Sequence, residues 1–486
     1  MILALLGLLN WWNRKNAYRS LNSLPSPPRH WLLGNLPQVL LAVRQKKYFQ
    51  FLFDWSRKLG PIYVYWIGAQ PILALSKPRA IEETIINGMK DGSLVRSHQI
   101  RDAWNDASGG AVIIGQDGKE WQWRRMAWNP EFSSSGLSKH IDIIDQACTQ
   151  VIEKIRATPS GETILVDPLF VELTMRVTCC LVLGIPLHPK ISSTEGPPLE
   201  VEKVYEAMSV ISYRFLRIAT GEKKWQKYLP TQLARDYWRA IAYLESFLAS
   251  RLDLALKLRD NTQSEEIPIT PMFRESMLVK IIAKEPQYNR SNLVSEIAGF
   301  LLAGTDTTAH TLSFATAQLS LNPRVLDKAR SLVDQVGENL KELNYIRSIV
   351  KETMRLYPVA AGSTSLEATR DTVIEGIKVP RGTRVFWSMW AAGRDPDTYT
   401  NPEEFLPERW LEEGKDNHDL PFIQFGSGYH RCLGEPLAMI EATMMLAKLL
   451  RYFEWELVNG GASLENLQQN LLVYPSDRMP LRFRLR

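Results

Sequence analysis

Ten residues near the carboxyl end decide the fold of this chain, and they read Phe425-Gly426-Ser427-Gly428-Tyr429-His430-Arg431-Cys432-Leu433-Gly434. Glycine adopts positive φ at little cost and lets the backbone pass close to a flat surface. After this segment the apolar residues recur at helical spacing, and Pro436 suits the first turn of a helix. Cys432 is therefore expected just ahead of a helix amino terminus, where the helix dipole and unpaired N–H groups stabilise a thiolate.

A thiolate in a glycine-lined loop is a suitable axial ligand for haem iron, because electron donation from the sulfur favours O–O cleavage. The loop alone is equally consistent with a buried cysteine at a loop–helix junction. The residue order decides between the two readings. Phe425, Gly428, His430, Cys432 and Gly434 match every fixed position of F-x-x-G-x-[HR]-x-C-x-G, and the segment thus resembles the haem-binding signature of the cytochrome P450 family.

This resemblance covers about residues 25–486 and rests on four motifs in the family's order. It implies a mainly α-helical fold with small β-sheets and a single haem-containing domain. It also implies haem b (iron protoporphyrin IX), with Cys432 as the axial thiolate and with Phe425, Gly426 and His430 at the cofactor.

A second motif lies in a helix predicted from Ser291 to Leu321 and stopped by Asn322-Pro323. Its middle, residues 303–308, reads Ala-Gly-Thr-Asp-Thr-Thr, and a glycine in a helix interior costs about 1 kcal/mol relative to alanine. Threonine hydroxyls that bond back to carbonyls, or a ladder opened to admit water, would compensate for this weakness. A polar patch facing solvent is the alternative, which the flanking apolar residues disfavour.

The same stretch resembles the pattern of the family's long central helix. By that resemblance, Thr307 hydrogen-bonds the oxygen that is activated and orders a water, Asp306 relays protons from bulk solvent, and Gly304 lies at the cofactor. Oxygen activation needs two protons, since one alone yields peroxide without bond cleavage. An acid–hydroxyl pair supplies that path.

Glu352 and Arg355 lie three residues apart and share one face of a predicted helix. Together with Arg409 they resemble the buried charged triad that braces the cysteine loop in this family. Trp410 stands where the family usually has Phe. This substitution keeps an aromatic plug, so we expect it to have little effect.

Trp121 and Arg125, four residues apart, resemble the pair that holds a haem propionate, and a guanidinium is the natural partner of a carboxylate. His430 is expected to contribute to a propionate as well. The chain departs from the family at Leu366, where many members carry an arginine. Either a propionate contact is missing there, or Arg370 or another cation replaces it.

The amino terminus begins with a run of twelve residues, Met-Ile-Leu-Ala-Leu-Leu-Gly-Leu-Leu-Asn-Trp-Trp. The run is too short for a spanning helix, which needs roughly 20 apolar residues, and it lacks the features of a cleaved signal peptide. It resembles an interfacial membrane anchor, and a helix packed on the protein's own surface is the alternative. We predict this apolar segment over residues 1–20, a proline-rich connector over 21–30 and a catalytic domain over 31–486, in the cytoplasm or on the cytoplasmic face of a membrane.

Strand-like runs occur early, at 61–68 and 71–75, and late, at 384–387 and 480–484, while helical spacing dominates from about 140 to 355. We therefore predict a hairpin and a small sheet made from early and late segments, which argues for one domain. The net charge of +5 arises from 58 basic and 53 acidic residues and gives no case for nucleic acid as a partner. Cys148, Cys179 and Cys180 show no metal or disulfide spacing and are expected to be buried thiols.

The predicted reaction inserts one atom of O₂ into a C–H or C=C bond of a lipophilic small molecule, of the fatty acid, terpenoid, sterol or carotenoid class. We find no flavin, iron–sulfur or dinucleotide motif, so the electrons of NAD(P)H are expected from an external reductase or ferredoxin. It would dock behind Cys432 on Arg431 and Lys448. The substrate pocket is expected from residues 95–112, 209–218, 300–307 and 359–366, with Phe300, Leu301 and Leu302 as apolar wall.

Two other functions remain open. An O₂-independent haem-thiolate isomerase or dehydratase would share the cysteine loop, but such enzymes usually lose the acid–threonine pair. A non-catalytic haem-binding sensor or carrier would normally show an output domain, and none is apparent in the sequence.

Overall fold

The computed structural model describes residues 17–187, 195–220, 222–260, 269–362, 365–411 and 420–486. The predicted amino-terminal anchor lies almost wholly outside the described residues. Contacts within the chain divide it into two compact units, each assembled from separate stretches of sequence. Unit 1 comprises Met1–Ile100, Lys351–Cys432 and Leu467–Tyr474, and unit 2 comprises Arg101–Val350, Leu433–Asn466 and Pro475–Arg486.

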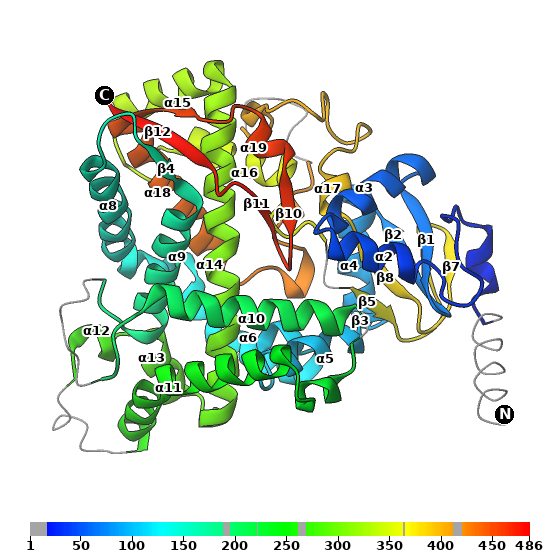
Figure 1. Ribbon diagram of the computed structural model, residues 1–486. Coiled ribbons are helices and arrows are strands. Elements are labelled where there is room, and N and C mark those ends of the chain that lie inside the picture. The colour runs from blue at the N-terminus through cyan, green and yellow to red at the C-terminus, as the bar shows by residue number, and fades with distance from the viewer. Residues whose placement is uncertain (1–16, 188–194, 221, 261–268, 363–364, 412–419) are drawn as a thin grey trace. The chain divides into compact units, whose positions relative to one another are not determined.

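Unit 1 contains a five-stranded sheet in the order β1-β2-β8-β5-β3 (Figure 1). Its strands are β1 (Ile62–Ile67), β2 (Gln70–Leu75), β3 (Leu94–Arg96), β5 (Leu366–Ala368) and β8 (Arg384–Trp387). β1 and β2 form the predicted antiparallel hairpin, and Gly68 takes the positive φ, 61°, that its tight turn requires. β2 then pairs in parallel with β8, with Ile72 opposite Arg384, so the prediction that early and late segments share a sheet is confirmed.

The other elements of unit 1 are η1 (Arg19–Ser23), α2 (Leu36–Arg44), α3 (Tyr48–Leu59), α4 (Pro78–Lys90), β6 (Thr372–Ile374), β7 (Ile377–Val379), α17 (Met389–Ala392), η6 (Pro407–Trp410), η7 (Gly428–His430) and β10 (Leu467–Gln469). Three elements contain residues of both units: α5 (His98–Ala107), α16 (Asn344–Leu356) and β11 (Val473–Pro475). Apolar side chains of α4 and of the sheet, among them Ile81, Leu73 and Val385, form a buried cluster that holds the sheet in place.

Unit 2 is mainly helical. Its helices are η2 (Ile113–Gly115), α6 (Gly118–Phe132), α7 (Ser134–Leu137), η3 (Ser138–His140), α8 (Ile141–Ala157), α9 (Val166–Leu183), α10 (Val201–Ala219), η4 (Lys224–Tyr228), α11 (Gln232–Asp260), α12 (Pro271–Arg274), α13 (Met277–Lys284), α14 (Arg290–Leu321), α15 (Pro323–Val336), α18 (Glu435–Tyr452) and α19 (Ala462–Glu465).

A three-stranded sheet closes unit 2, in the order β4-β12-β9, from β4 (Thr163–Leu165), β12 (Pro480–Leu485) and β9 (Phe453–Leu457). The predicted carboxyl-terminal strand is therefore present, but it belongs to a different sheet from the early strands. Its partners are set by ring contacts, since Phe483 meets Phe453 at 5.6 Å and Trp455 at 6.3 Å between centroids.

The long helix α14 matches the predicted limits to within one residue. Asn289 and Asn292 cap its amino end reciprocally, and Pro323 begins the next helix. α9 packs along it (Figure 1). A Cβ at Gly304 would lie only 2.8 Å from the hydroxyl of Thr178 on α9, so this glycine permits the close approach of the two helices.

Glu352 on α16 is the centre of a buried charge cluster in unit 1. Arg355 donates to both of its carboxylate oxygens, at 2.9 and 2.8 Å, and Arg409 donates to one of them at 3.1 Å. All three side chains are buried. Arg355 also donates to the carbonyls of residues 393, 402 and 404, which ties this irregular segment to α16. The predicted triad is therefore present.

Trp410 makes a polar contact as well as an aromatic one, so the expectation that tryptophan in place of phenylalanine has little effect is wrong. Its indole N–H donates to Glu352 at 2.8 Å, a bond that a phenylalanine in this position cannot make. The ring also meets Phe422, at 5.2 Å between centroids and nearly perpendicular. Trp410 thus joins the charge cluster to the aromatic side chains that precede Cys432.

Replacing Trp410 by Phe keeps the ring contact but removes a donor to a buried carboxylate. We expect Trp410→Phe to lower the free energy of unfolding by about 1.5–3 kcal/mol, the usual contribution of a hydrogen bond to a charged group. Urea unfolding measures this. Trp31→Phe is the matched control, because Trp31 is 66% exposed and its replacement is expected to change stability by less than about 0.5 kcal/mol. Equal midpoints for the two variants would show that the bond contributes nothing.

Candidate active site

The cysteine loop closes on itself through backbone hydrogen bonds. The N–H of Cys432 donates to the carbonyl of Phe425 at 2.8 Å, and that of Gly426 donates to Ile423, also at 2.8 Å. Gly426 and Gly428 have φ of 74° and 64°, which confirms the predicted need for glycine at these two positions. α18 begins at Glu435, three residues after Cys432, as predicted.

Aromatic contacts link this loop to the charge cluster. Phe425 meets Phe422 at 5.9 Å between centroids, and Phe422 meets Trp410, which hydrogen-bonds Glu352. The path from the buried carboxylate to the loop is therefore continuous within unit 1. Through these contacts the charge cluster can brace the cysteine loop, as the sequence predicts.

Cys432 differs from the other three cysteines in its exposure. Cys148, Cys179 and Cys180 are buried as predicted, whereas Cys432 is exposed. Burial raises the pKa of Cys179 and of Cys180 to about 12, so both stay neutral thiols at physiological pH. Cys432 is thus the one cysteine of the chain whose sulfur is accessible to a ligand.

His430 lies beside an arginine that the sequence analysis did not single out. Arg96, the last residue of β3, donates from Nη2 to Nδ1 of His430 at 2.9 Å. β3 pairs with β5 so that Arg96 stands directly opposite Leu366. The position that lacks the family's arginine therefore has a cation across the strand pair. Arg370, the other replacement considered, is more than half exposed and pairs with Asp91 at 3.2 Å.

The middle of α14 presents one open face. Ala303 is exposed and Thr307 is half-buried, while Leu301, Thr305 and Thr308 are buried. The hydroxyl of Thr307 donates to the carbonyl of Ala303 at 2.8 Å, which is the predicted back-bond one turn earlier. The helix is continuous here, so the structure shows the back-bond and not an opened ladder.

Asp306 is half-buried, and one of its carboxylate oxygens is buried in unit 2. The alternative of a polar patch that faces solvent is therefore wrong for this residue. Burial raises the pKa of Asp306, and the charges of His310 and Arg478 and a hydrogen bond from Tyr205 partly oppose this. A carboxyl with a raised pKa holds a proton more readily than an ordinary surface aspartate. This property suits the proton-relay role that the sequence assigns to it.

Trp121 and Arg125 both lie on α6 and are half-buried. The neighbouring Arg124 is buried and pairs with Glu296 of α14 at 3.2 Å, so it has a structural role. Burial raises the pKa of Glu296 to about 7 despite this pair. The propionate role of Trp121 and Arg125, and the cofactor role of Gly304, remain predictions.

Two expectations about side chains near the site are wrong. Lys448 is buried and pairs with Glu338 at 2.6 Å and Asp145 at 2.9 Å, so it cannot serve as a docking residue. Leu301 is completely buried and Leu302 is 4% exposed, so they belong to the core of unit 2. Helical periodicity alone did not distinguish these core positions from a pocket wall.

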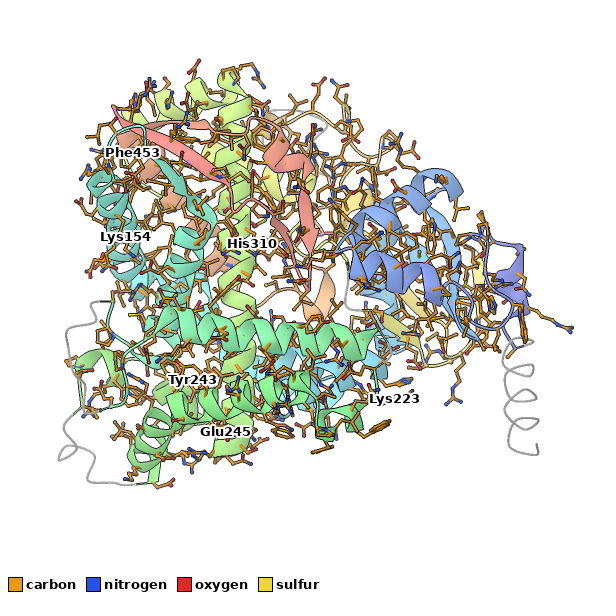
Figure 2. The ribbon with its side chains drawn as sticks, viewed as in Figure 1. Lys154, Lys223, Tyr243, Glu245, His310 and Phe453 are labelled. Carbon is orange, nitrogen blue, oxygen red and sulfur yellow. The ribbon has the colours of Figure 1, made fainter. Side chains whose placement is uncertain are left out.

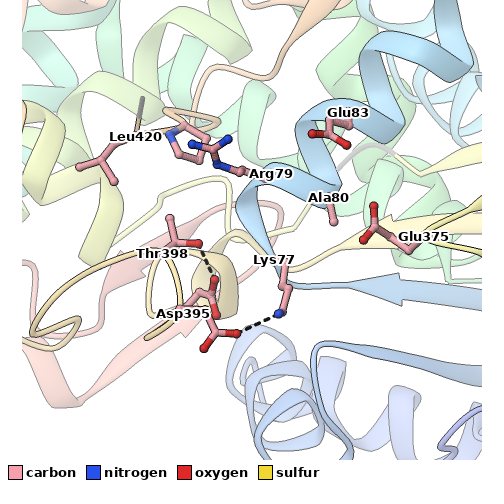
Figure 3. Close-up of a pocket in the computed structure, with 10 residues that line it drawn as sticks. Lys77, Arg79, Ala80, Glu83, Glu375, Asp395, Thr398 and Leu420 are labelled. Atoms are coloured by element: carbon pink, nitrogen blue, oxygen red, sulfur yellow. Dashed lines mark hydrogen bonds and ion pairs between the residues drawn. The ribbon is translucent and has the colours of Figure 1, made fainter. Parts of the chain in front are cut away.

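Figure 3 shows a pocket in unit 1 that has a charged lining. Lys77 pairs with Asp397 at 2.8 Å, and Thr398 donates to Asp395 at 2.5 Å. None of the predicted site residues lines it. A lining of paired charges does not suit a lipophilic ligand, so this pocket is not the predicted substrate site.

The sequence model of the family described as Cytochrome P450 matches residues 24–483 and runs through both units. The chain belongs to the cytochrome P450 family. It is 27% identical to Cytochrome P450 71A1 of Persea americana, over 91% of this chain and 87% of that protein. It is 25% identical to Cytochrome P450 4d2 of Drosophila melanogaster, over 93% and 92%. The 3,9-dihydroxypterocarpan 6A-monooxygenase of Glycine max is 26% identical over 93% and 91%.

The residues of this P450 fit the haem iron that the family implies. An accessible thiol stands in a tight glycine loop, and thiolate sulfur is an axial ligand of haem iron. Arg96 and His430 supply adjacent N–H donors of the kind that bind carboxylates such as propionates. The protein is therefore a haem-thiolate monooxygenase, a single P450 domain built from the two interleaved units.

The position of Arg96 gives a direct prediction. We expect Arg96→Gln to release haem several-fold faster than the wild-type protein to an excess of apomyoglobin, because a charge-assisted contact to a propionate is lost. Arg370→Gln is the matched control, since that arginine is exposed and pairs with Asp91. Equal release rates from the two variants would remove Arg96 from the haem site.

Proposed function

We propose that this P450 inserts one atom of O₂ into a C–H or C=C bond of a lipophilic substrate, using haem b and electrons from a separate NAD(P)H-dependent reductase or ferredoxin. One observation carries the proposal. The open face of α14 presents Ala303 and the hydroxyl of Thr307, and the buried carboxyl of Asp306 lies next to it in the chain.

When bound, haem supplies reductive activation of O₂, with Cys432 as its thiolate ligand. The small side chain of Ala303 leaves room beside α14. Thr307 donates its proton to the carbonyl of Ala303, so the remaining lone pairs of its oxygen can accept a hydrogen bond from a water. Thr307 thus holds a water in place, and Asp306 provides the proton that this water passes on.

The two competing functions fit less well. An O₂-independent isomerase or dehydratase has no use for a proton-holding carboxyl beside a threonine, and this chain retains both residues. The name of the soybean relative states that it is a monooxygenase, which supports oxygenation. A carrier without turnover would not need a buried carboxyl with a raised pKa either.

The substrate class rests on apolar surroundings. Phe300, half-buried on α14, contacts Trp128 and Phe132 of α6, at 4.3 and 5.6 Å between centroids. This aromatic group supports a fatty acid, terpenoid, sterol or carotenoid substrate in preference to a polar one. A spectral binding screen against a lipid and isoprenoid panel tests the class. We expect apolar members to change the absorbance spectrum of the holoenzyme in a saturable manner, and a response confined to polar compounds would contradict the assignment.

A peripheral contact with a membrane is consistent with a lipophilic substrate. No helix among the described residues is long and apolar enough to cross a bilayer. The segment around η4 exposes Trp225 and Tyr228, at 59% and 70%, next to the exposed Lys223, while Lys224 and Lys227 pair with Asp102 and Asp106. Exposed aromatic rings beside cations suit an anionic lipid surface, and we propose a location in the cytoplasm or at its membrane face.

The redox partner is proposed to dock beside the cysteine loop. Arg431 remains a predicted contact, while the buried Lys448 is excluded. Arg431→Glu is expected to slow the first electron transfer and to weaken its salt dependence. An unchanged rate and salt dependence would move the docking face elsewhere.

Removal of the Thr307 hydroxyl tests the proposed chemistry. We expect Thr307→Ala to consume NAD(P)H with a several-fold lower yield of product and a matching gain of peroxide, because the water is no longer held. Thr307→Ser keeps a hydroxyl and is the matched control, which we expect to stay coupled. Tight coupling in Thr307→Ala would contradict the role of this side chain.

A further inference from the structure

Hydrogen bonds between buried side chains join α6 to the start of α14 in unit 2. The indole N–H of Trp128 on α6 donates to the hydroxyl oxygen of Tyr288 at 2.7 Å, and this hydroxyl lies 3.1 Å from Oε1 of Glu296 on α14. An indole N–H only donates, so the Tyr288 oxygen accepts from Trp128 and its own proton points to Glu296. All three side chains are buried, so Tyr288 donates to a carboxylate that is shielded from bulk water.

Glu296 is arranged to accept a proton. In the described part of the chain the groups that contact it are all donors: the N–H of Ile113 at 2.8 Å and Arg124 at 3.2 Å on Oε2, and Tyr288 on Oε1. Burial raises the pKa of Glu296 to about 7, and the charge of Arg124 and these hydrogen bonds partly oppose the rise. Glu296 is thus a base whose proton affinity is well above that of an ordinary carboxylate.

Tyr288 loses its proton only together with an electron. Burial and the charge of Glu296 raise the pKa of Tyr288, so the phenol stays neutral in the resting protein. A phenol that gives up one electron becomes a strong acid, and its proton then moves along the existing hydrogen bond to Glu296. This coupled transfer leaves no new charge on the ring, and it makes Tyr288 easier to oxidise than a tyrosine whose hydroxyl donates to a carbonyl.

Aromatic contacts extend from Tyr288 towards the open face of α14. Trp128 meets Phe300 at 4.3 Å between ring centroids, and Phe300 lies on α14, the long helix that carries His310 in Figure 2. Ala303 on the open face follows three residues later, about 4.5 Å along the helix axis. Tyr288 is therefore connected through Trp128 to the side of α14 where O₂ is proposed to be activated.

Trp123 connects Tyr288 to the protein surface. The two ring centroids lie 4.9 Å apart, and the indole N–H of Trp123 donates to the exposed Glu120 at 3.1 Å. The guanidinium of Arg124 lies 4.6 Å from the centre of the Trp123 ring. A cation over a ring makes that ring harder to oxidise, so the oxidised state stays on Tyr288, and Trp123 serves as an entry for electrons from solvent.

We propose that Tyr288 is a redox-active residue that protects the haem site when activation of O₂ is not followed by oxygenation of a substrate. The oxidising equivalent left at the haem site takes one electron from Tyr288 through Trp128, and the phenolic proton passes to Glu296. The products are a neutral tyrosyl radical and a carboxylic acid. A thiol in solution returns one electron through Trp123, releases its proton to water and is left as a thiyl radical, while Glu296 gives the proton back to Tyr288. This inference rests on the proposed monooxygenase function.

Freeze-quenched electron paramagnetic resonance tests the proposal on the ferric holoenzyme mixed with m-chloroperbenzoate, a peracid oxidant that needs neither NAD(P)H nor a redox partner. We expect a tyrosyl signal in the wild-type protein and a several-fold smaller one in Tyr288→Phe. Tyr237→Phe is the matched control, because Tyr237 is also buried but donates to the backbone carbonyl of Asp106 at 2.6 Å, which takes no proton. No tyrosyl signal in the wild-type protein, or an equal signal in Tyr288→Phe, would overturn the proposal.

Glu296→Gln removes the proton acceptor and leaves Tyr288 in place. In the wild-type protein we expect the tyrosyl yield to rise as the pH is raised through about 7, because Glu296 ionises there. In Glu296→Gln the yield should be several-fold lower and independent of pH, while Glu206→Gln, an exposed position on α10, should behave as wild type. A wild-type yield and pH profile in Glu296→Gln would remove Glu296 from the coupled transfer.

The protective role predicts the rate of haem destruction. With the same peracid, the haem absorbance of Tyr288→Phe should decay several-fold faster than that of the wild-type protein or Tyr237→Phe, and glutathione should slow the decay in all but Tyr288→Phe. Equal decay rates would overturn the protective role. If the wild-type protein oxygenates no compound of the lipid panel but shows the Tyr288 signal and slow decay, the proposed function fails and the role of Tyr288 stands.

Discussion

A single buried carboxylate, Glu352, holds together the part of this P450 that carries its reactive cysteine. An isolated carboxylate in a protein interior is costly, and Glu352 is stable because two guanidinium groups, a backbone N–H and an indole N–H all donate to it. The constraint extends outward through Trp410, Phe422 and Phe425, whose carbonyl accepts from the N–H of Cys432. The geometry of the thiol loop thus depends on a charge that it does not contact directly and to which Trp410 and Phe422 connect it.

The carboxylates in the interior of this protein differ in the hydrogen-bond donors around them and in the direction of their pKa shift. Glu352 has a full set of donors. Burial acts to raise the pKa of Asp167, but the charges of His310 and Arg478 and the hydrogen bonds from His310 and Ser313 together lower it. Asp306 is only half-buried, but one of its carboxylate oxygens is buried without a partner among the described residues, and burial raises its pKa. The same fold therefore keeps one carboxylate permanently charged for structure and allows its neighbour to gain and lose a proton for chemistry.

Local sequence predicted the features that depend on local backbone. The limits of α14 followed from its cap and from Pro323, the hairpin from its strand pattern, and the positive φ of Gly426 and Gly428 from their place in the cysteine loop. The features that sequence missed depend on contacts between distant segments. The bond from Trp410 to Glu352, the burial of Lys448 and the place of Arg96 opposite Leu366 each need the tertiary fold to be known. Arg96 ends a short apolar strand, a weak signal that sequence reasoning passed over.

The most direct test of haem ligation by Cys432 is the carbon monoxide difference spectrum of the freshly purified, reduced protein. Thiolate ligation gives an absorption maximum clearly displaced to longer wavelength than histidine ligation does. We expect the thiolate type for the wild-type protein and its loss in Cys432→Ser, with Cys180→Ser unchanged because that thiol is buried. A histidine-type maximum in fresh wild-type protein, or a thiolate-type maximum that survives in Cys432→Ser, would contradict the assignment of Cys432 as the ligand.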